Sequence, residues 1–241
     1  MGSLLLLTFK RMLRDYIGVS LLVVLPIGLI SLIGLVAGYM AIPEGIPVMD
    51  WLSISFVLSF QLFGGAYTMS YLKEDMFSPR RWRIMSLPLR IDLYSFIIVT
   101  ASTCYSMVQG LSIVLFTHLV YGVHWGNILW LLVVLFLISL LSQIVCLICL
   151  LTVKSFKLAE RLSEVYGIGS MVFAGLIFGL PNNGFFTFMN TYGNPVSVAR
   201  HAILEMLDGV ASQAALFAVL LLAASLLLFP VTAWLGKRRL A

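Results

Sequence analysis

The sequence predicts an all-α integral membrane protein with six transmembrane helices, an amphipathic helix before the first span and a re-entrant outer element before the last one. Of the 241 residues, 61% are hydrophobic and only 10% are charged, whereas a soluble domain carries roughly 25% charged residues. Six apolar runs are long enough to cross a bilayer, which takes about 20 residues per helix. Most basic residues gather on one side of the membrane when these runs alternate. A soluble enzyme or a nucleic-acid-binding module is therefore excluded as the main interpretation.

The first segment, Ser3–Tyr16, mixes apolar side chains with Lys10, Arg11 and Arg14. On a helix this order gives one apolar face and one basic edge, which suits a helix lying in the plane of the membrane interface. The alternative is a solvated basic leader to the first span.

The six apolar runs define the predicted spans, of which the fifth is barely long enough to cross. Pro26 lies inside the first run and predicts a kink there. The runs are Ile17–Ala41, Trp51–Leu72, Leu93–Tyr121, Ile128–Val153, Val165–Leu180 and Ala211–Leu235.

The placement of charge checks the number of spans. With a cytoplasmic N-terminus and six alternating spans, 14 of the 15 basic residues fall inside and only Arg200 falls outside. The outer segments carry Glu44, Asp50, Glu205 and Asp208. The positive-inside rule therefore predicts a multi-pass protein of the plasma membrane with both termini in the cytoplasm.

We expect a single transmembrane domain over residues 1–241. Its parts are the amphipathic helix 1–16, spans one and two in 17–72, a cytoplasmic loop 73–92, spans three to five in 93–180, an outer re-entrant segment 181–210, and span six with a basic tail in 211–241.

The cytoplasmic loop is expected to contain a short helix. Ser78 can cap its N-terminus, Pro79 suits the first helical position, and Pro88 disfavours helical geometry at the residue before it. Such a basic helix can rest on anionic headgroups, or it can fit into a groove on a cytoplasmic partner with Trp82 as the anchor. The residues that the second interpretation assigns to docking are Glu74, Asp75, Arg80, Arg81, Trp82, Arg83 and Met85.

The order of these elements resembles the type-2 permease family of ATP-binding-cassette (ABC) transporters. The charged cluster Lys73-Glu74-Asp75 and the Leu- and Pro-containing stretch Ile84–Arg90 stand where that family has its inner-loop motifs. The chain departs from the family at Met76–Pro79, where a Gly-Thr pair is common. Two further stretches resemble the end of the family's fifth span and its Asn-Pro turn, namely Gly175–Pro181 and Gly193–Ser197.

The resemblance implies a permease subunit that pairs with a second permease, identical or homologous, and with two copies of a cytoplasmic nucleotide-binding ATPase subunit. The inner loop would be the coupling helix and Ser3–Tyr16 the connecting helix. The chain has no G-x-x-x-x-G-K-[ST] phosphate loop, so ATP and Mg would be bound by the partner subunit. We therefore expect no cofactor, metal site or catalytic residue in this chain, and no nucleic-acid partner.

The outer segment Pro181–Gly209 is rich in aromatic residues. Under a transport function, Phe185, Phe186 and Phe188 would form an outer gate, with non-helical backbone tolerated only where protein or water covers it. The alternative is a surface helix lying on headgroups.

Ionisable residues are almost absent from the middle of the spans. This disfavours a proton- or sodium-driven mechanism. The polar residues Ser55, Ser59, Gln61 and Gln109 are candidates for a transport pathway, and interhelical hydrogen bonding is their alternative role.

These observations predict an exporter of a hydrophobic or amphipathic cargo, such as a drug or an antimicrobial peptide, with efflux and antibiotic resistance as its expected consequences. An exporter of a lipid or lipid-linked glycan, and a non-transporting membrane anchor or sensor subunit, remain as alternatives. An intramembrane enzyme is disfavoured because no paired carboxylates, H-E-x-x-H motif or Ser/His dyad falls at membrane depth.

Overall fold

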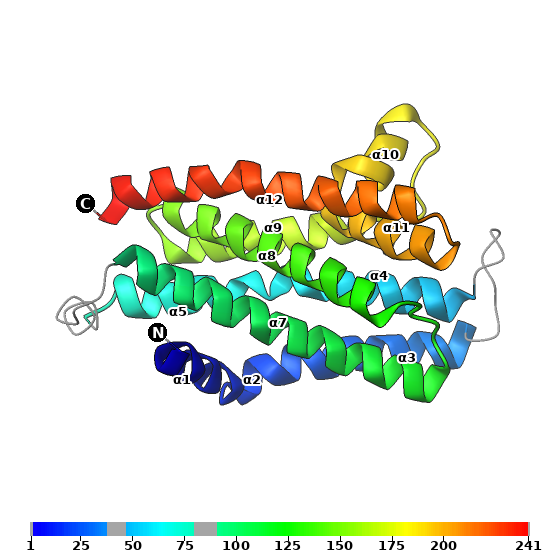
Figure 1. The fold of residues 1–241 in the computed structure, drawn as a ribbon, viewed down its shortest axis with the longest axis horizontal. Helices are drawn as coiled ribbons and strands as arrows, with labels where there is room; N and C mark the ends of the chain where they lie inside the picture. Colours follow the sequence, from blue (N-terminus) through cyan, green and yellow to red (C-terminus); the bar gives the residue numbers. More distant parts are fainter. Residues whose placement is uncertain (1, 38–46, 80–90, 241) are drawn as a thin grey trace.

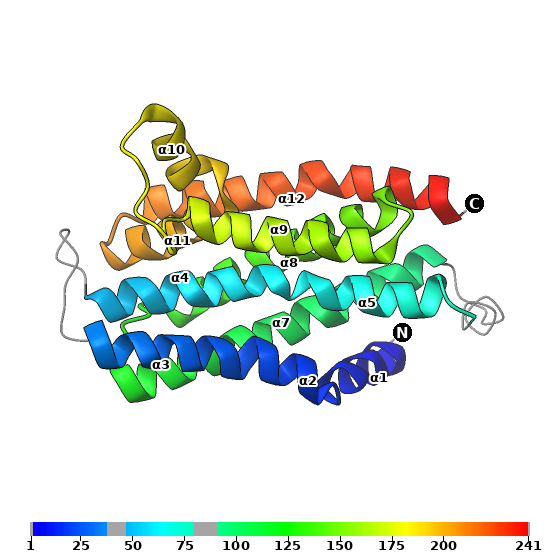
Figure 2. The same cartoon turned by 180° about the vertical axis from the view of Figure 1, so that it is seen from behind.

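A computed structural model of the chain describes residues 2–37, 47–79 and 91–240. These residues form an elongated bundle in which most helices run along the longest axis (Figures 1 and 2). The first helix and the C-terminal end of the last helix lie at the same end of the bundle, and the segment before the last helix lies at the other end. The predicted all-α class is confirmed for the described part of the chain, in which the regular elements are all helical.

The N-terminal segment folds as α1 (Gly2–Leu13), followed by α2 (Tyr16–Val19). The chain turns between them at Asp15, whose carboxylate accepts a hydrogen bond from the Gly18 backbone N–H and caps α2. The amphipathic helix predicted for 1–16 therefore ends at Leu13, because Asp15 satisfies the first turn of a new helix.

The first predicted span folds as α2, a π-helical turn η1 (Ser20–Val24) and α3 (Leu25–Ala37). Pro26 lies just after the π-helical turn. A proline ring has no N–H and conflicts with the carbonyl four residues earlier, and a wider π-turn relieves that conflict. The helix adapts to Pro26, where the sequence predicts a kink, through this π-helical turn.

The second predicted span is divided into α4 (Val48–Phe63) and α5 (Gly65–Met76), with a turn at Gly64. Gly65 lies where α5 crosses closely over α8, since a Cβ there would stand 2.7 Å from the Ser142 carbonyl oxygen. Residues 53–62 of α4 are all buried, as expected for a helix surrounded by others.

The next two helices, α7 (Ile91–Tyr121) and α8 (Ile128–Thr152), match the third and fourth predicted spans. The Asn127 side chain caps α8 by accepting hydrogen bonds from the Leu129 and Trp130 N–H groups. Helix α8 is central, because it packs against α4, α5, α7, α9, α11 and α12.

The fifth predicted span differs most from the structure. Helix α9 (Phe156–Phe173) begins well before the expected start at Val165 and ends before the expected end at Leu180. Gly175, with φ +72°, closes it in a Schellman motif: its own N–H bonds to Val172 O, and the following N–H bonds to Met171 O. The apolar run begins only at Val165 because the first half of the helix carries charged residues, and it continues past Gly175, where the backbone conformation ends the helix.

The segment predicted to lie outside the membrane folds into α10 (Gly184–Phe188), the π-helical turn η2 (Met189–Gly193) and α11 (Pro195–Leu207). Asn194 caps α11, with Pro195 in the first helical position. Helix α11 packs against the last helix, α12 (Ala211–Leu240), and also against α4 and α8, while α10 projects from the bundle (Figures 1 and 2).

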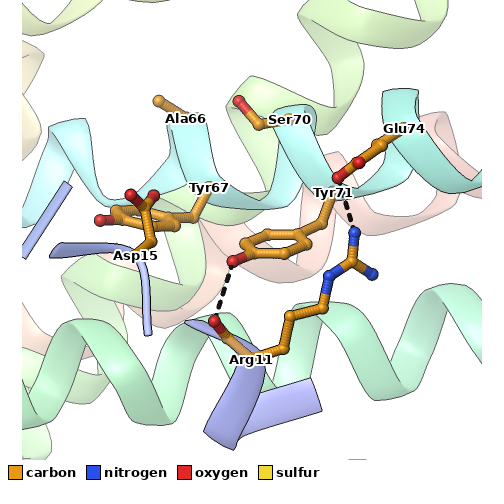
Figure 3. Close-up of a pocket in the computed structure, with 7 residues that line it drawn as sticks. All are labelled: Arg11, Asp15, Ala66, Tyr67, Ser70, Tyr71 and Glu74. Carbon is orange, nitrogen blue, oxygen red and sulfur yellow. Dashed lines mark hydrogen bonds and ion pairs between the residues drawn. The ribbon is translucent and has the colours of Figure 1, made fainter. Parts of the chain in front are cut away.

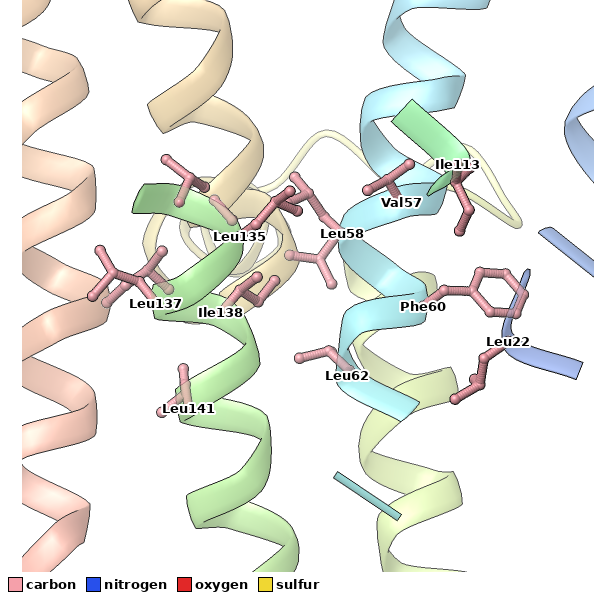
Figure 4. Packing of buried hydrophobic residues seen from close by; sticks show 14 of the residues in the cluster. Leu22, Val57, Leu58, Phe60, Leu62, Ile113, Leu135, Leu137, Ile138 and Leu141 are labelled. Carbon is pink, nitrogen blue, oxygen red and sulfur yellow. The ribbon is translucent and has the colours of Figure 1, made fainter. Parts of the chain in front are cut away.

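One hydrophobic core runs through the bundle. Its centre is formed by α4 and α8, where Leu58, Leu62, Leu135 and Ile138 are nearly completely buried (Figure 4). Within the described residues, five helical segments are long and apolar enough to cross a membrane, and α9 is not one of them. The count of six stays a prediction. The five segments are Tyr16–Val36, Val48–Asp75, Leu93–Tyr121, Ile128–Thr152 and Ala211–Arg238.

Candidate functional site

An ionic joint ties the amphipathic helix α1 to the bundle. The Arg11 guanidinium on α1 donates from Nη1 to both carboxylate oxygens of Asp75, at 3.2 and 3.1 Å, and from Nη2 to Glu74 at 2.6 Å. The Tyr94 hydroxyl on α7 donates to Asp75 at 2.6 Å. We use the name ionic joint for these four residues, which link α1, α5 and α7 on both sides of the segment 77–90.

Burial differs sharply between the two acids of the joint. Asp75 is 4% exposed, whereas the Glu74 side chain is 44% exposed. A buried carboxylate is stable only with partners that compensate for its lost hydration, and Asp75 has both a guanidinium and a hydroxyl. Burial lowers the pKa of Arg11, but attraction to Asp75 and Glu74 raises it more, so the pKa lies above its usual value.

A cavity of about 390 Å³ adjoins the joint, between the α1–α2 turn and α5. Figure 3 shows Asp15 at one end of it, the Arg11–Glu74 pair at the other, and the rings of Tyr67 and Tyr71 between them. The Arg11 guanidinium lies 4.6 Å from the centre of the Tyr71 ring. The α1 helix is therefore held by an ionic and aromatic contact at one edge, with open space beside it.

The docking residues predicted from the sequence divide into two groups. Glu74 and Asp75 lie in the last turns of α5 and are engaged by Arg11 of the same chain. The other five, Arg80, Arg81, Trp82, Arg83 and Met85, lie outside the described residues, as does the short helix predicted between Ser78 and Pro88.

The candidate pathway residues are all buried within the chain. Gln61 donates to the Ser106 carbonyl at 3.0 Å and accepts from Ser139 at 2.6 Å, which joins α4 to α7 and α8. The Ser59 hydroxyl donates to the Ser55 carbonyl in its own helix.

A polar network continues from Gln61 around the α4–α5 turn. Gln143 accepts from Thr68 and donates to the Ser106 hydroxyl at 3.2 Å. Gln109 lies on the same helix as Ser106 and is 6% exposed. In this conformation the network connects α4, α5, α7 and α8.

The three candidate gate residues lie on the projecting helix α10. Phe185 and Phe188 are 56% and 54% exposed. Phe185 and Phe186 pack on each other with ring centres 5.4 Å apart, and both lie 6.4 Å from the ring of Phe173 at the end of α9. The aromatic cluster therefore closes over the end of α9.

Arg200 occupies a position that sequence reasoning missed. It is 3% exposed, although the charge pattern predicts it simply as the one basic residue outside the membrane. Its guanidinium donates to the Ala174 carbonyl at 2.9 Å and to Asn190 at 2.8 Å, and it lies over the Trp51 ring. It thus holds α4, the end of α9 and η2 around α11.

Arg11 and Tyr94 were also missed as members of a site. The only sequence signal for Arg11 was its place on the basic edge of an amphipathic helix, and Tyr94 gave none. No group of three or more His, Cys, Asp or Glu side chains that could hold a metal ion occurs among the described residues.

Comparisons with known proteins add no family assignment. No protein-family model matches the chain, and no curated protein matches it significantly.

Proposed function

We propose that this chain is the membrane permease subunit of an ATP-driven exporter, with ATP hydrolysed by a separate cytoplasmic ATPase subunit. The ionic joint is the observation that carries the proposal. It links three helices at the two ends of the segment 77–90, which contains the basic residues and Trp82 expected to dock on a partner.

A mechanical role for the joint follows from its contacts. A push on the segment 77–90 acts on the C-terminal end of α5 and the N-terminal end of α7, between which it runs. Asp75 and Tyr94 bind each other across these two ends, and Arg11 binds α1 to the same point. The three helices then move as one rigid body. Such coupled movement is required if a conformational change of the ATPase is to reach the membrane helices.

In this proposal α9 forms the sixth crossing. It lies beside α8 and α4 and runs along the bundle from one end towards the other (Figure 2). At about 1.5 Å per residue its 18 residues measure ~27 Å, close to the thickness of a hydrocarbon core. Segment α10–α11 is then a re-entrant outer element, with the phenylalanines of α10 as the outer gate.

The cargo in this proposal is hydrophobic or amphipathic. The spans expose many large apolar side chains and few charged ones, and the buried hydroxyl and amide groups are largely hydrogen-bonded within the chain. A second copy of this permease, or a homologous one, and two ATPase copies would complete the transporter.

Co-purification tests the proposal directly. The chain is expressed together with candidate cytoplasmic ATPase subunits from its own source, and any complex is isolated in nanodiscs. We expect two ATPase copies per permease pair, lost in a Trp82→Ala/Arg83→Ala variant and retained in a Lys157→Ala/Arg161→Ala control, which removes two exposed basic residues of α9. Hydrolysis by the complex should rise with at least one member of a broad panel of apolar compounds.

Two results would reject it. A chain that purifies without an ATPase, and is indifferent to the Trp82 and Arg83 changes, would favour a membrane anchor or sensor. Loss of the ATPase in both double variants would show general charge attraction rather than docking at the inner loop.

A further inference from the structure

A deep groove lies on the bundle surface between α7 and α12, away from the ionic joint. Its volume is about 1030 Å³, against about 390 Å³ for the cavity beside the ionic joint. Helix α8 forms its floor, because α7 and α12 each pack against α8 but, over the described residues, make almost no contact with each other. Figure 1 shows α8 running between these two helices.

The walls of the groove are mostly apolar, and most of the hydroxyl groups on the residues that line it already donate within their own helix. Thr103, Ser225 and Thr232 each donate to a backbone carbonyl of their own helix, at 2.8, 2.9 and 2.6 Å. Their hydrogen-bonding capacity as donors is therefore satisfied. A polar ligand would lose its hydration against these walls and gain few hydrogen-bond partners, whereas hydrocarbon would lose nothing.

One end of the groove carries positive charge. Lys237, in the last turns of α12, is the only charged side chain among the described residues that line it. It is exposed, and the chain continues with Arg238 and Arg239. A lysine at the end of a membrane helix lies at headgroup level, where it attracts anionic lipids.

The length of the groove suits an acyl chain. The α12 wall extends from Leu222 to Lys237, which at about 1.5 Å per residue is ~22 Å. One leaflet of a bilayer has a hydrocarbon depth of about 15 Å. A chain anchored at Lys237 would thus lie in the groove through the full depth of its leaflet.

The groove opens towards the surrounding lipid. Phe96 and Phe229, on opposite walls, are 59% and 56% exposed. Water in such a groove would find few polar partners, and an empty groove would forfeit the dispersion contacts of its walls. Acyl chains are therefore the favoured filling.

We propose that this groove binds an anionic diacyl phospholipid, with its acyl chains along α8 between α7 and α12 and its phosphate beside Lys237. The proposal does not depend on the transport function. It assigns to this face a specific lipid, whereas the rest of the apolar surface contacts bulk bilayer.

Native mass spectrometry of the full chain tests it. The protein in detergent is mixed with equal amounts of phosphatidylglycerol and phosphatidylcholine, and retained lipids are counted. A lysine near an anionic lipid surface contributes about 1 kcal/mol, or roughly fivefold in affinity. We expect Lys237→Gln to lower phosphatidylglycerol retention by about that factor, and the matched Arg238→Gln variant, outside the groove lining, to leave it unchanged.

A second pair of variants tests the chain-binding part. Ala233 is exposed on the α12 wall, so Ala233→Trp should fill the groove and abolish retention of both lipids. Leu227 is 75% exposed and does not line the groove, so Leu227→Trp is the control.

Cys104 gives a readout that needs no bulky substitution. It is exposed and lines the α7 wall, so phosphatidylglycerol should slow its alkylation by a maleimide in the wild type but not in Lys237→Gln. Equal loss of lipid in Lys237→Gln and Arg238→Gln, or unchanged alkylation of Cys104 with phosphatidylglycerol, would overturn the proposal.

Discussion

Asp75 is the residue on which the contacts at one end of the bundle converge. Its carboxylate is nearly completely buried, and it accepts hydrogen bonds from Arg11 of α1 and Tyr94 of α7. Charge-assisted hydrogen bonds of this kind contribute more than neutral ones. Glu74, its neighbour, binds the same guanidinium from a half-exposed position, where water screens the interaction.

This difference predicts unequal effects of removing the two charges. Asp75→Asn should weaken the attachment of α1 by about 1–2 kcal/mol, since hydrogen bonds to a buried charge are lost. Glu74→Gln should cost at most about 1 kcal/mol. Hydrogen–deuterium exchange of residues 2–13 in nanodiscs measures both. Similar exchange in the two variants would contradict a central role for Asp75.

At the scale of elements, the division of the second span into α4 and α5 allows close packing against α8. The turn at Gly64 and Gly65 lies within the polar network of Gln61, Ser106 and Gln143. A Cβ at Gly65 would stand 2.5 Å from the Cys146 sulfur and 2.7 Å from the Ser142 carbonyl oxygen. A backbone oxygen of a central helix cannot move aside as a flexible side chain can.

Gly65→Ala should therefore force α5 away from α8 and destabilise the protein by about 1–3 kcal/mol, as overpacking does. Gly28→Ala is the matched control, because a Cβ at this position in α3 meets no atom within 4 Å, and alanine favours a helix by about 1 kcal/mol over glycine. Thermal unfolding in detergent measures both. Equal melting temperatures for the two variants would show that α5 and α8 can separate freely.

For the whole molecule, the proposed topology depends on α9. The other five long segments qualify as membrane spans by length and composition. Helix α9 carries Lys157, Glu160, Arg161 and Glu164 in its first half, and these four charged residues make it less apolar than the other five. Its packing against α4 and α8 shows that it belongs to the bundle.

Single cysteines, introduced after the three native cysteines are replaced by alanine, test whether α9 crosses. We expect Lys154→Cys, before α9, to react with a membrane-impermeant maleimide only from the cytoplasm. Asn183→Cys, after α9, should react only from outside, as should Asn127→Cys in the α7–α8 connection. Reaction of Lys154→Cys and Asn183→Cys from the same side would reduce the protein to five crossings.

Most helices could be predicted from local sequence signals, and their ends depend on neighbouring residues only. Asn127 starts α8 and Gly175 ends the turn after α9 through hydrogen bonds within a few residues. The predicted fifth span, Val165–Leu180, starts too late in the chain because α9 begins with charged residues. Apolar periodicity alone does not detect such a helix. The sequence identifies the polar residues of the predicted spans by their residue type. It does not predict which residues they hydrogen-bond to.

Composition and the spacing of apolar runs by themselves determined that this protein is helical and suited to a membrane, because burial in lipid requires long apolar helices whatever their neighbours. Only the tertiary structure decided that Arg11 meets Asp75, 64 positions away, that Arg200 is buried beside Ser55, 145 positions away, and that α7 and α12 leave a groove over α8. These features arise from the relative positions of whole helices, which packing of side-chain surfaces sets and which no local pattern in the chain records.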